Sequence, residues 1–272
     1  PFFSVVKNNG RQLVENPLTE KNGRYYMDFD DLRRKIDKRT KALILCSPHN
    51  PVGRVWTKEE LRLLCDICYK NNVLIISDEI HCDLVFEPHK HIPTAKISKE
   101  IANMTVTCIA PSKTFNMAGL STSLFHSSNP ELLADFKKTA ENLFIHHGNL
   151  FGITALEAAY NYGNDWLEQL LDYLNGNIEF AIDFIKKRMP VIKVQKPEAT
   201  YLLWLDFRHL GLKPEELKQL MINKAKVGMN DGISFGEQGT GFQRLNVACP
   251  REILKNALED RKSTRLNSSH YS

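Results

Sequence analysis

Short apolar runs alternate with amphipathic stretches between residues 40 and 125. The apolar runs are rich in β-branched residues and have the length of buried strands, expected at residues 42–46, 73–77 and 104–109. After the first run, apolar residues recur at helical spacing from Leu61 to Cys68, and Thr57 followed by Glu60 predicts a capping box at the start of this helix. Strands that alternate with helices predict a mostly parallel sheet sandwiched by helices, which is an α/β fold.

A second block of elements follows residue 130. A long helix is expected at residues 165–189, with leucine and isoleucine along one face and Pro190 at its end. The other predicted helices are residues 130–144, 151–162, 214–226 and 251–260, and the further strands are residues 200–207 and 242–247. We therefore expect a large domain at residues 1–164, and a connecting helix with a smaller α+β domain at residues 165–262.

Both ends of the chain depart from these patterns. The sequence opens on Pro1-Phe-Phe without an initiator methionine, so we expect the N-terminal part of the large domain to be missing. Residues 263–272 are polar and show no periodicity. This tail is expected to be non-native and to lie outside the fold.

Composition narrows the function classes. The net charge of +4 is small against 36 basic and 32 acidic residues, and no basic stripe is interleaved with aromatic residues, so nucleic acid is not an expected partner. No apolar run approaches the roughly 20 residues that span a bilayer, so no membrane is expected.

The six cysteines lie mostly in apolar patterns, which favours reduced thiols in a cytoplasmic protein. Cys65 and Cys68 form a C-x-x-C without a second ligand pair, so no metal site is predicted.

Polar residues follow the ends of three predicted strands. Asn50, Asp78 and Lys113 each come just after a strand, where open α/β sheets bind their ligands. Lys113 is the one ionisable residue in residues 110–120. A desolvated lysine amine tends toward its neutral, nucleophilic form, which makes a Schiff base with an aldehyde cofactor. The common alternative for any single lysine is a solvated surface charge.

Pyridoxal phosphate is an aldehyde cofactor, and we consider what these residues would do if it is the one bound. Its ring nitrogen must be protonated to draw electrons, and Asp78 is placed to stabilise that charge. The amide of Asn50 can donate to the ring oxygen, and His81 can reach the same edge of the ring. Each residue has a plainer interpretation: Asp78 as a helix cap, Asn50 as a turn residue, and His81 as a loop histidine or a metal ligand with His89 and His91.

Four segments carry a family resemblance. They are Asn50-Pro-Val-Gly53, Ser77-Asp-Glu-Ile-His-Cys-Asp83, Ser112-Lys-Thr-Phe-Asn-Met-Ala-Gly119 and Arg244-Leu-Asn-Val-Ala-Cys-Pro250. Their order and approximate spacing resemble fold-type I pyridoxal-phosphate enzymes of the aminotransferase class I/II superfamily. The second and third segments look like the cystathionine β-lyase branch typified by the MalY and PatB proteins. The resemblance covers about residues 1–260.

The resemblance implies a role for each matching residue. Lys113 would be the Schiff-base lysine and the proton shuttle, and Asp78 the partner of the pyridinium nitrogen. Asn50 would donate to the ring oxygen, and Ser112 would contact the phosphate. Arg244 would hold the α-carboxylate of the substrate, for which its planar fork gives a bidentate fit. The fold implied is an incomplete aspartate aminotransferase-like large domain with a small C-terminal domain, assembled as a homodimer.

The reaction implied is that of a carbon–sulfur β-lyase. Such an enzyme of the cystathionine β-lyase type cleaves a small sulfur-containing amino acid to a thiol, pyruvate and ammonia. A class I/II aminotransferase would use the same residues and is the first alternative. A non-catalytic truncated fragment, or a regulatory binding protein on the same fold, is the second.

Overall fold

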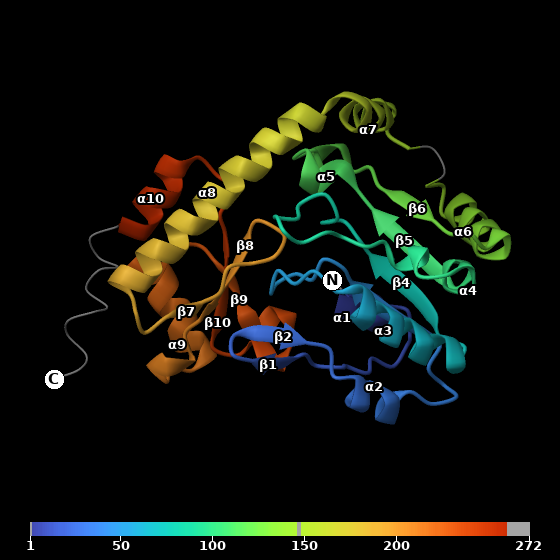
Figure 1. Ribbon diagram of the computed structural model, residues 1–272, viewed down its shortest axis with the longest axis horizontal. Coiled ribbons are helices and arrows are strands. Elements are labelled where there is room, and N and C mark those ends of the chain that lie inside the picture. Colours follow the sequence, from blue (N-terminus) through green and yellow to red (C-terminus); the bar gives the residue numbers. More distant parts are fainter. Residues whose placement is uncertain (1, 146–147, 260–272) are drawn as a thin grey trace. The chain divides into compact units, whose positions relative to one another are not determined.

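The computed structural model describes residues 2–145 and 148–259, and these form two compact units (Figure 1). Unit 1 holds residues 2–48, 55–85 and 90–167, and unit 2 holds residues 49–54, 86–89 and 168–259. The last of the boundaries between the units along the chain lies inside helix α8 (Asn164–Arg188). The tail predicted at residues 263–272 lies outside the described residues.

A four-stranded sheet forms the centre of unit 1. Its order is β3 (Ala42–Cys46), β4 (Leu74–Asp78), β5 (Thr105–Ile109) and β6 (Leu124–His126). The β3–β4 and β4–β5 pairs are parallel, whereas β6 is antiparallel to β5. The prediction of an α/β fold with a mostly parallel sheet is therefore confirmed, and β6 is an addition to the predicted strands.

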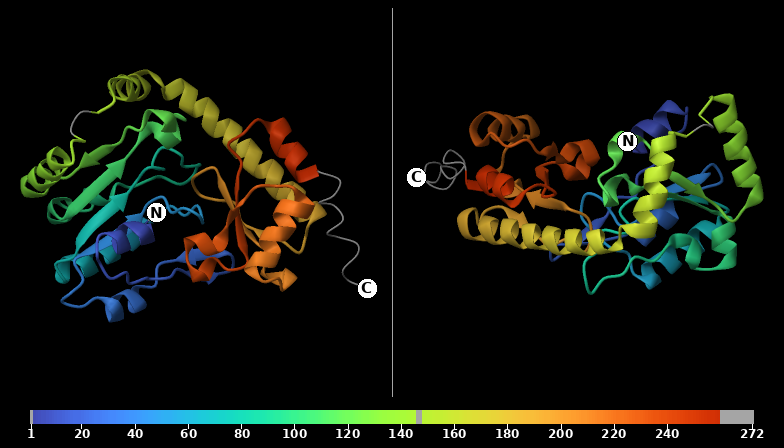
Figure 2. Two further views of the ribbon diagram at one scale, coloured as in Figure 1. Left: turned by 180° about the vertical axis from the view of Figure 1, so that it is seen from behind. Right: turned by 90° about the horizontal axis from the view of Figure 1, so that it is seen from above.

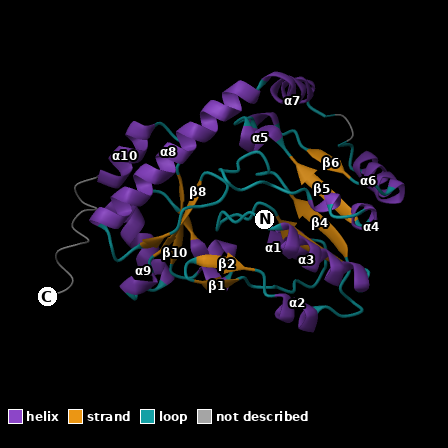
Figure 3. Ribbon diagram, viewed as in Figure 1, coloured by secondary structure: helices purple, strands orange, loops and turns teal. Residues whose placement is uncertain are grey.

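Helices surround this sheet (Figure 3). Helix α3 (Lys58–Lys70) begins at the predicted capping box, in which the Thr57 hydroxyl accepts from the Glu60 amide and the Glu60 carboxylate accepts from the Thr57 amide. The remaining helices of four or more residues in unit 1 are α1 (Phe2–Asn8), α2 (Phe29–Lys35), α4 (Lys99–Asn103), α5 (Pro111–Thr114), α6 (Pro130–Asn142) and α7 (Leu150–Tyr162). A small hairpin, β1 (Thr19–Lys21) and β2 (Arg24–Tyr26), precedes α2.

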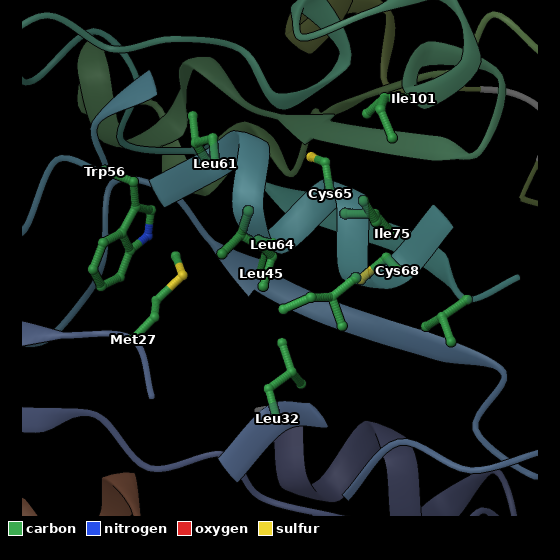
Figure 4. Close-up of a cluster of buried hydrophobic side chains, with 12 residues drawn as sticks. Met27, Leu32, Leu45, Trp56, Leu61, Leu64, Cys65, Cys68, Ile75 and Ile101 are labelled. Atoms are coloured by element: carbon green, nitrogen blue, oxygen red, sulfur yellow. The ribbon is translucent and has the colours of Figure 1, made fainter. Parts of the chain in front are cut away.

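The core of unit 1 lies where α3 covers the sheet. Leu61 and Leu64 of α3 are almost wholly buried, and in Figure 4 Leu64 lies beside Leu45 of β3, with Leu32 of α2 facing the same cluster. Each such side chain contributes about 1.5–3 kcal/mol by leaving water. The buried Trp56 donates from Nε1 to the Cys46 carbonyl at 2.9 Å, which ties the start of α3 to the end of β3.

Unit 2 is built on a separate antiparallel sheet. Its strand order is β7 (Lys193–Val194), β8 (Leu202–Asp206), β10 (Phe242–Asn246) and β9 (Asn230–Asp231). Helix α9 (Pro214–Gln219) continues as a π-helical turn (Leu220–Ala225), and α10 (Arg251–Glu259) lies beside α8 (Figure 2). Asn177 of α8 holds the segment between β10 and α10, because it donates to the Val247 and Cys249 carbonyls at 2.8 and 2.9 Å.

All six cysteines are free thiols, as predicted. Burial raises the pKa of Cys65 and of Cys68 to about 12, so this C-x-x-C pair is unreactive at neutral pH. Among the described helices, none combines the length and the apolar character needed to cross a membrane.

Candidate active site

Asp78 is the last residue of β4 and lies half-buried at the carboxyl edge of the unit 1 sheet. Its Oδ1 accepts a hydrogen bond from the Ile80 amide at 3.3 Å. Burial raises the pKa of Asp78, and the neighbouring Glu79 charge adds to this, whereas the Ile80 amide and the positive charge of Lys113 act in the opposite direction. A cation placed against this carboxylate would therefore be stabilised.

Lys113 lies on α5, the four-residue helix that follows β5. Because β4 and β5 are parallel neighbours with Asp78 in register with Cys108, both site residues emerge at the same edge of the sheet. Lys113 is half-buried and close enough to Asp78 to act on its pKa. Within residues 2–145 and 148–259, no side chain forms a hydrogen bond or ion pair with the Lys113 amine. The amine is therefore available to a ligand.

Glu79, directly after Asp78, is buried in a network that sequence reasoning missed. Its Oε1 accepts from the Ser77 hydroxyl at 2.7 Å and from the Thr94 amide at 3.0 Å, and its Oε2 lies 2.8 Å from His91 Nε2. Burial acts to raise the pKa of Glu79. The hydrogen bond and charge of His91, together with the bonds from Thr94 and Ser77, lower this pKa by more than burial raises it, so the net shift is downward. The network holds the loop that returns after β4 against the strand end that carries Asp78.

Asp83 forms a second network beside Lys113. Its Oδ2 accepts from the Thr114 hydroxyl at 2.8 Å and from the Tyr160 hydroxyl at 3.2 Å. Thr114 is fully buried and directly follows Lys113 in the chain. Glu79 and Asp83 both lie within the segment 77–83 singled out in the sequence, but their partners are distant in sequence and no local pattern indicates them.

His81 and Ser112 also belong to unit 1. His81 is 3% exposed, and Ser112 is half-buried on α5 beside Lys113. The sequence left open that His81 is instead a metal ligand together with His89 and His91. The described part of the chain contains no cluster of three His, Cys, Asp or Glu side chains that could hold a metal ion.

Asn50 and Arg244 meet in unit 2. Arg244 lies on β10, and its Nη1 donates to Asn50 Oδ1 at 2.8 Å while its Nη2 donates to Asn230 Oδ1 at 2.8 Å. The guanidinium also lies over the Phe235 ring, 4.7 Å from its centroid. Its buried Nε has no hydrogen-bond partner among the described residues. Arg244 is thus held by neutral partners that a carboxylate could replace.

The six predicted site residues therefore fall into two groups. Unit 1 brings Asp78 and Lys113 together, with His81 and Ser112 in the same unit, and unit 2 brings Asn50 and Arg244 together. The convergence of both groups on one ligand stays a prediction.

Known proteins resemble this chain along most of its length. Residues 2–260 match the family Aminotransferase class I and II. Cystathionine beta-lyase PatB of Bacillus subtilis (strain 168) is 43% identical over 259 residues, which cover 95% of this chain and 67% of that protein. A crystal structure of a PLP-bound putative aminotransferase from Clostridium difficile 630 has a TM-score of 0.94 at 52% identity. Cystalysin from Treponema denticola, whose crystal structure contains pyridoxal 5'-phosphate, has a TM-score of 0.95 at 37% identity. Both structural comparisons cover 97% of this chain and 68% of the other, so the chain spans about two thirds of the length of these relatives.

Proposed function

The chain belongs to the aminotransferase class I and II family, and from this premise we propose that it is a pyridoxal-phosphate-dependent carbon–sulfur β-lyase. It cleaves a sulfur-containing amino acid of the cystathionine type to a thiol, pyruvate and ammonia. The observation that carries the proposal is the pair of Asp78 and Lys113 at the ends of neighbouring parallel strands, in a chain 43% identical to a cystathionine β-lyase.

The residues of unit 1 fit pyridoxal phosphate in their chemistry. The cofactor carries an aldehyde, a basic ring nitrogen and a phosphate. Lys113 offers a half-buried amine with no partner in the described protein, Asp78 a half-buried carboxylate, and Ser112 a hydroxyl. Lys113 would bind the aldehyde, Asp78 would face the ring nitrogen, and Ser112 would contact the phosphate. When bound, the cofactor supplies an electron sink for the substrate's α-carbon.

The chain's own residues would do the remaining work. The Lys113 amine would act as the general base and take the proton from the substrate's α-carbon. The Asp78 carboxylate would keep the opposing ring nitrogen protonated. The Arg244 guanidinium would bind the substrate carboxylate, and Asn50 and His81 would contact the cofactor's ring oxygen.

A class I/II aminotransferase is the second candidate. It is supported by the 52% identity to a putative aminotransferase from Clostridium difficile 630. The two activities differ in their products, because a transaminase needs an amino acceptor and leaves the carbon–sulfur bond intact.

We also propose a homodimer in the cytoplasm. The six free thiols support the location. Support for the dimer comes from apolar side chains around α7 that are mostly exposed in the single chain: Phe144 at 85%, Phe151 at 76% and Tyr162 at 85%. In the same proposal, residues 1–164 form the cofactor-binding domain and residues 165–262 the connecting helix and small domain. A single-chain mass in light scattering at micromolar concentration would contradict the dimer.

The test is incubation of the protein with pyridoxal phosphate and cystathionine. We expect pyruvate and a free thiol without any added amino acceptor, and a borohydride-stable adduct on Lys113 in the peptide map. Lys113→Ala should abolish both. Formation of a 2-oxo acid only when an acceptor is present would favour the aminotransferase. A protein that gives neither product nor adduct would refute both enzymes.

A further inference from the structure

Asp83 connects three segments of unit 1 at one carboxylate. It lies on the loop after β4, and its Oδ2 accepts from Thr114 on α5 and from Tyr160 on α7, at 2.8 and 3.2 Å. The adjacent Cys82 thiol donates to the other oxygen, Oδ1, at 3.6 Å. None of the roles proposed above uses these residues.

Two of these contacts act on the residues directly after Lys113. Thr114 has no exposed surface, and its hydroxyl is bound by Asp83. Phe115 packs edge-to-face on Tyr160, with ring centroids 5.4 Å apart, and lies 5.9 Å from the Trp166 ring. The backbone that carries Lys113 is therefore fixed on its C-terminal side by a hydrogen bond and by an aromatic contact.

The Lys113 side chain has no comparable support of its own. Its amine forms no hydrogen bond or ion pair with the described residues, and α5 is only four residues long. A lysine that must bind a cofactor and also carry a proton cannot be held by a permanent side-chain partner. The precision of its placement must then come from the backbone and from what holds the backbone.

On the basis of the proposed function, we propose that Asp83 is a positioning residue that sets the placement of the Lys113 amine through its hydrogen bond to Thr114. A carboxylate suits this task because its charge strengthens both hydroxyl contacts. Burial and the Asp83 charge raise the pKa of Tyr160, so its phenol stays protonated and remains a donor. Asp83 thus ties the loop that follows Asp78 to the turn that presents Lys113.

The test uses Thr114→Val, which removes the hydroxyl and keeps the shape of the side chain. Thr114→Ser keeps the hydroxyl and is the conservative rescue. The matched control is Thr105→Val, because Thr105 is also fully buried and donates to the Ile101 carbonyl at 2.7 Å, but lies at the opposite end of β5. Asp83→Asn tests the carboxylate itself and replaces Thr114→Val if that variant does not fold.

Two readouts separate positioning from general stability. We expect Thr114→Val and Asp83→Asn to lower kcat about 10- to 100-fold with little change in KM, because small misplacements of a reacting group have effects of this size. The second readout is the pH at which the visible absorbance of the bound cofactor is halfway through its pH-dependent change, measured without substrate. In these two variants this midpoint should shift by about half a pH unit or more, since the surroundings of the Lys113 amine change. Thr114→Ser and Thr105→Val should keep the wild-type midpoint and kcat.

The outcomes distinguish the inference from the proposed function. If wild-type protein forms the Lys113 adduct but Thr114→Val has the same midpoint and kcat as Thr105→Val, Asp83 is structural only and the inference is wrong. Equal losses in Thr114→Ser and Thr114→Val would overturn it as well, because the hydroxyl would then be irrelevant. If the wild-type protein forms no borohydride-stable adduct on Lys113, the proposed function is wrong, and so is the inference that rests on it.

Discussion

Replacing Glu79 by glutamine should destabilise unit 1 by about 2–4 kcal/mol at pH 7. The carboxylate is 1% exposed and accepts from Ser77 and Thr94, with His91 Nε2 2.8 Å from its second oxygen. Bonds to a charged acceptor are worth about 1.5–3 kcal/mol each, whereas neutral ones are worth about 1 kcal/mol. The amide keeps one acceptor oxygen and presents an NH2 group to His91. The loss of stability is therefore the difference between the charged and the neutral form of these three contacts, and not their whole strength.

The pH dependence provides an independent check on the same carboxylate. The folded state lowers the pKa of Glu79 below its ordinary value of 4.5. Its contribution to stability is therefore fully present above about pH 4.5 and is lost as the pH falls through the folded-state pKa. Glutamine does not titrate. The difference in unfolding free energy between wild type and Glu79→Gln should stay constant at neutral pH and shrink in acid.

The assay is urea unfolding followed by tryptophan fluorescence in a Trp204→Phe background. Of the three tryptophans, Trp56 and Trp166 lie in unit 1 and Trp204 in unit 2, so the remaining signal reports on unit 1. Glu59→Gln is the control, because Glu59 is exposed and should change stability by less than about 0.5 kcal/mol. A Glu79→Gln variant as stable as Glu59→Gln at pH 7, or a difference that grows in acid, would refute this account of the network.

Three further predictions concern other parts of the chain. Thr57→Ala removes the side chain that caps α3 and should cost about 1 kcal/mol in urea unfolding, and no loss would mean that the bond to Glu60 contributes nothing. Gly53→Ala should destabilise unit 2 by more than about 2 kcal/mol, because Gly53 has φ 69° and a Cβ there would overlap Pro197; a melting temperature equal to wild type would contradict this. Arg244→Lys should raise KM for the amino-acid substrate about 10- to 100-fold with kcat nearly unchanged, as the bidentate fork is lost, and a selective fall in kcat would assign Arg244 to the reaction step instead.

Sequence pattern predicted the elements that bury a strong apolar face. The strands expected at residues 42–46, 73–77 and 104–109 are observed at residues 42–46, 74–78 and 105–109, and α3 begins at the predicted capping box. The β1–β2 hairpin was missed because its strands have three residues each and none of these residues is fully buried. A signal was present, since Asn22-Gly23 forms its turn with φ of 53° and 78°. Asp28, the N-cap of α2, was a second readable signal.

The family could be predicted because its motifs are local. Each of the four segments is a short run of residues, and all four lie within residues 2–260, which match the aminotransferase class I and II family. Glu79 and Asp83 lie inside one of these segments, but their functions depend on partners brought in by the fold. His91 and Thr94 reach Glu79 through the returning loop, and Tyr160 reaches Asp83 from α7. Only the three-dimensional structure assigns these contacts.

The proximity of one pair of site residues can be predicted from the sequence, whereas that of the other pair cannot. Asp78 and Lys113 follow strands that are parallel neighbours, and the carboxyl ends of such strands meet at one edge, so their proximity follows from the strand pattern. Asn50 and Arg244 are 194 residues apart and lie on a loop and on an antiparallel strand. Arg244 is in register with Asn230 across β9 and β10, which orients its guanidinium by cross-strand pairing. Such pairing depends on a register that the apolar pattern of β10 alone does not determine, so the contact with Asn50 had to come from the structure.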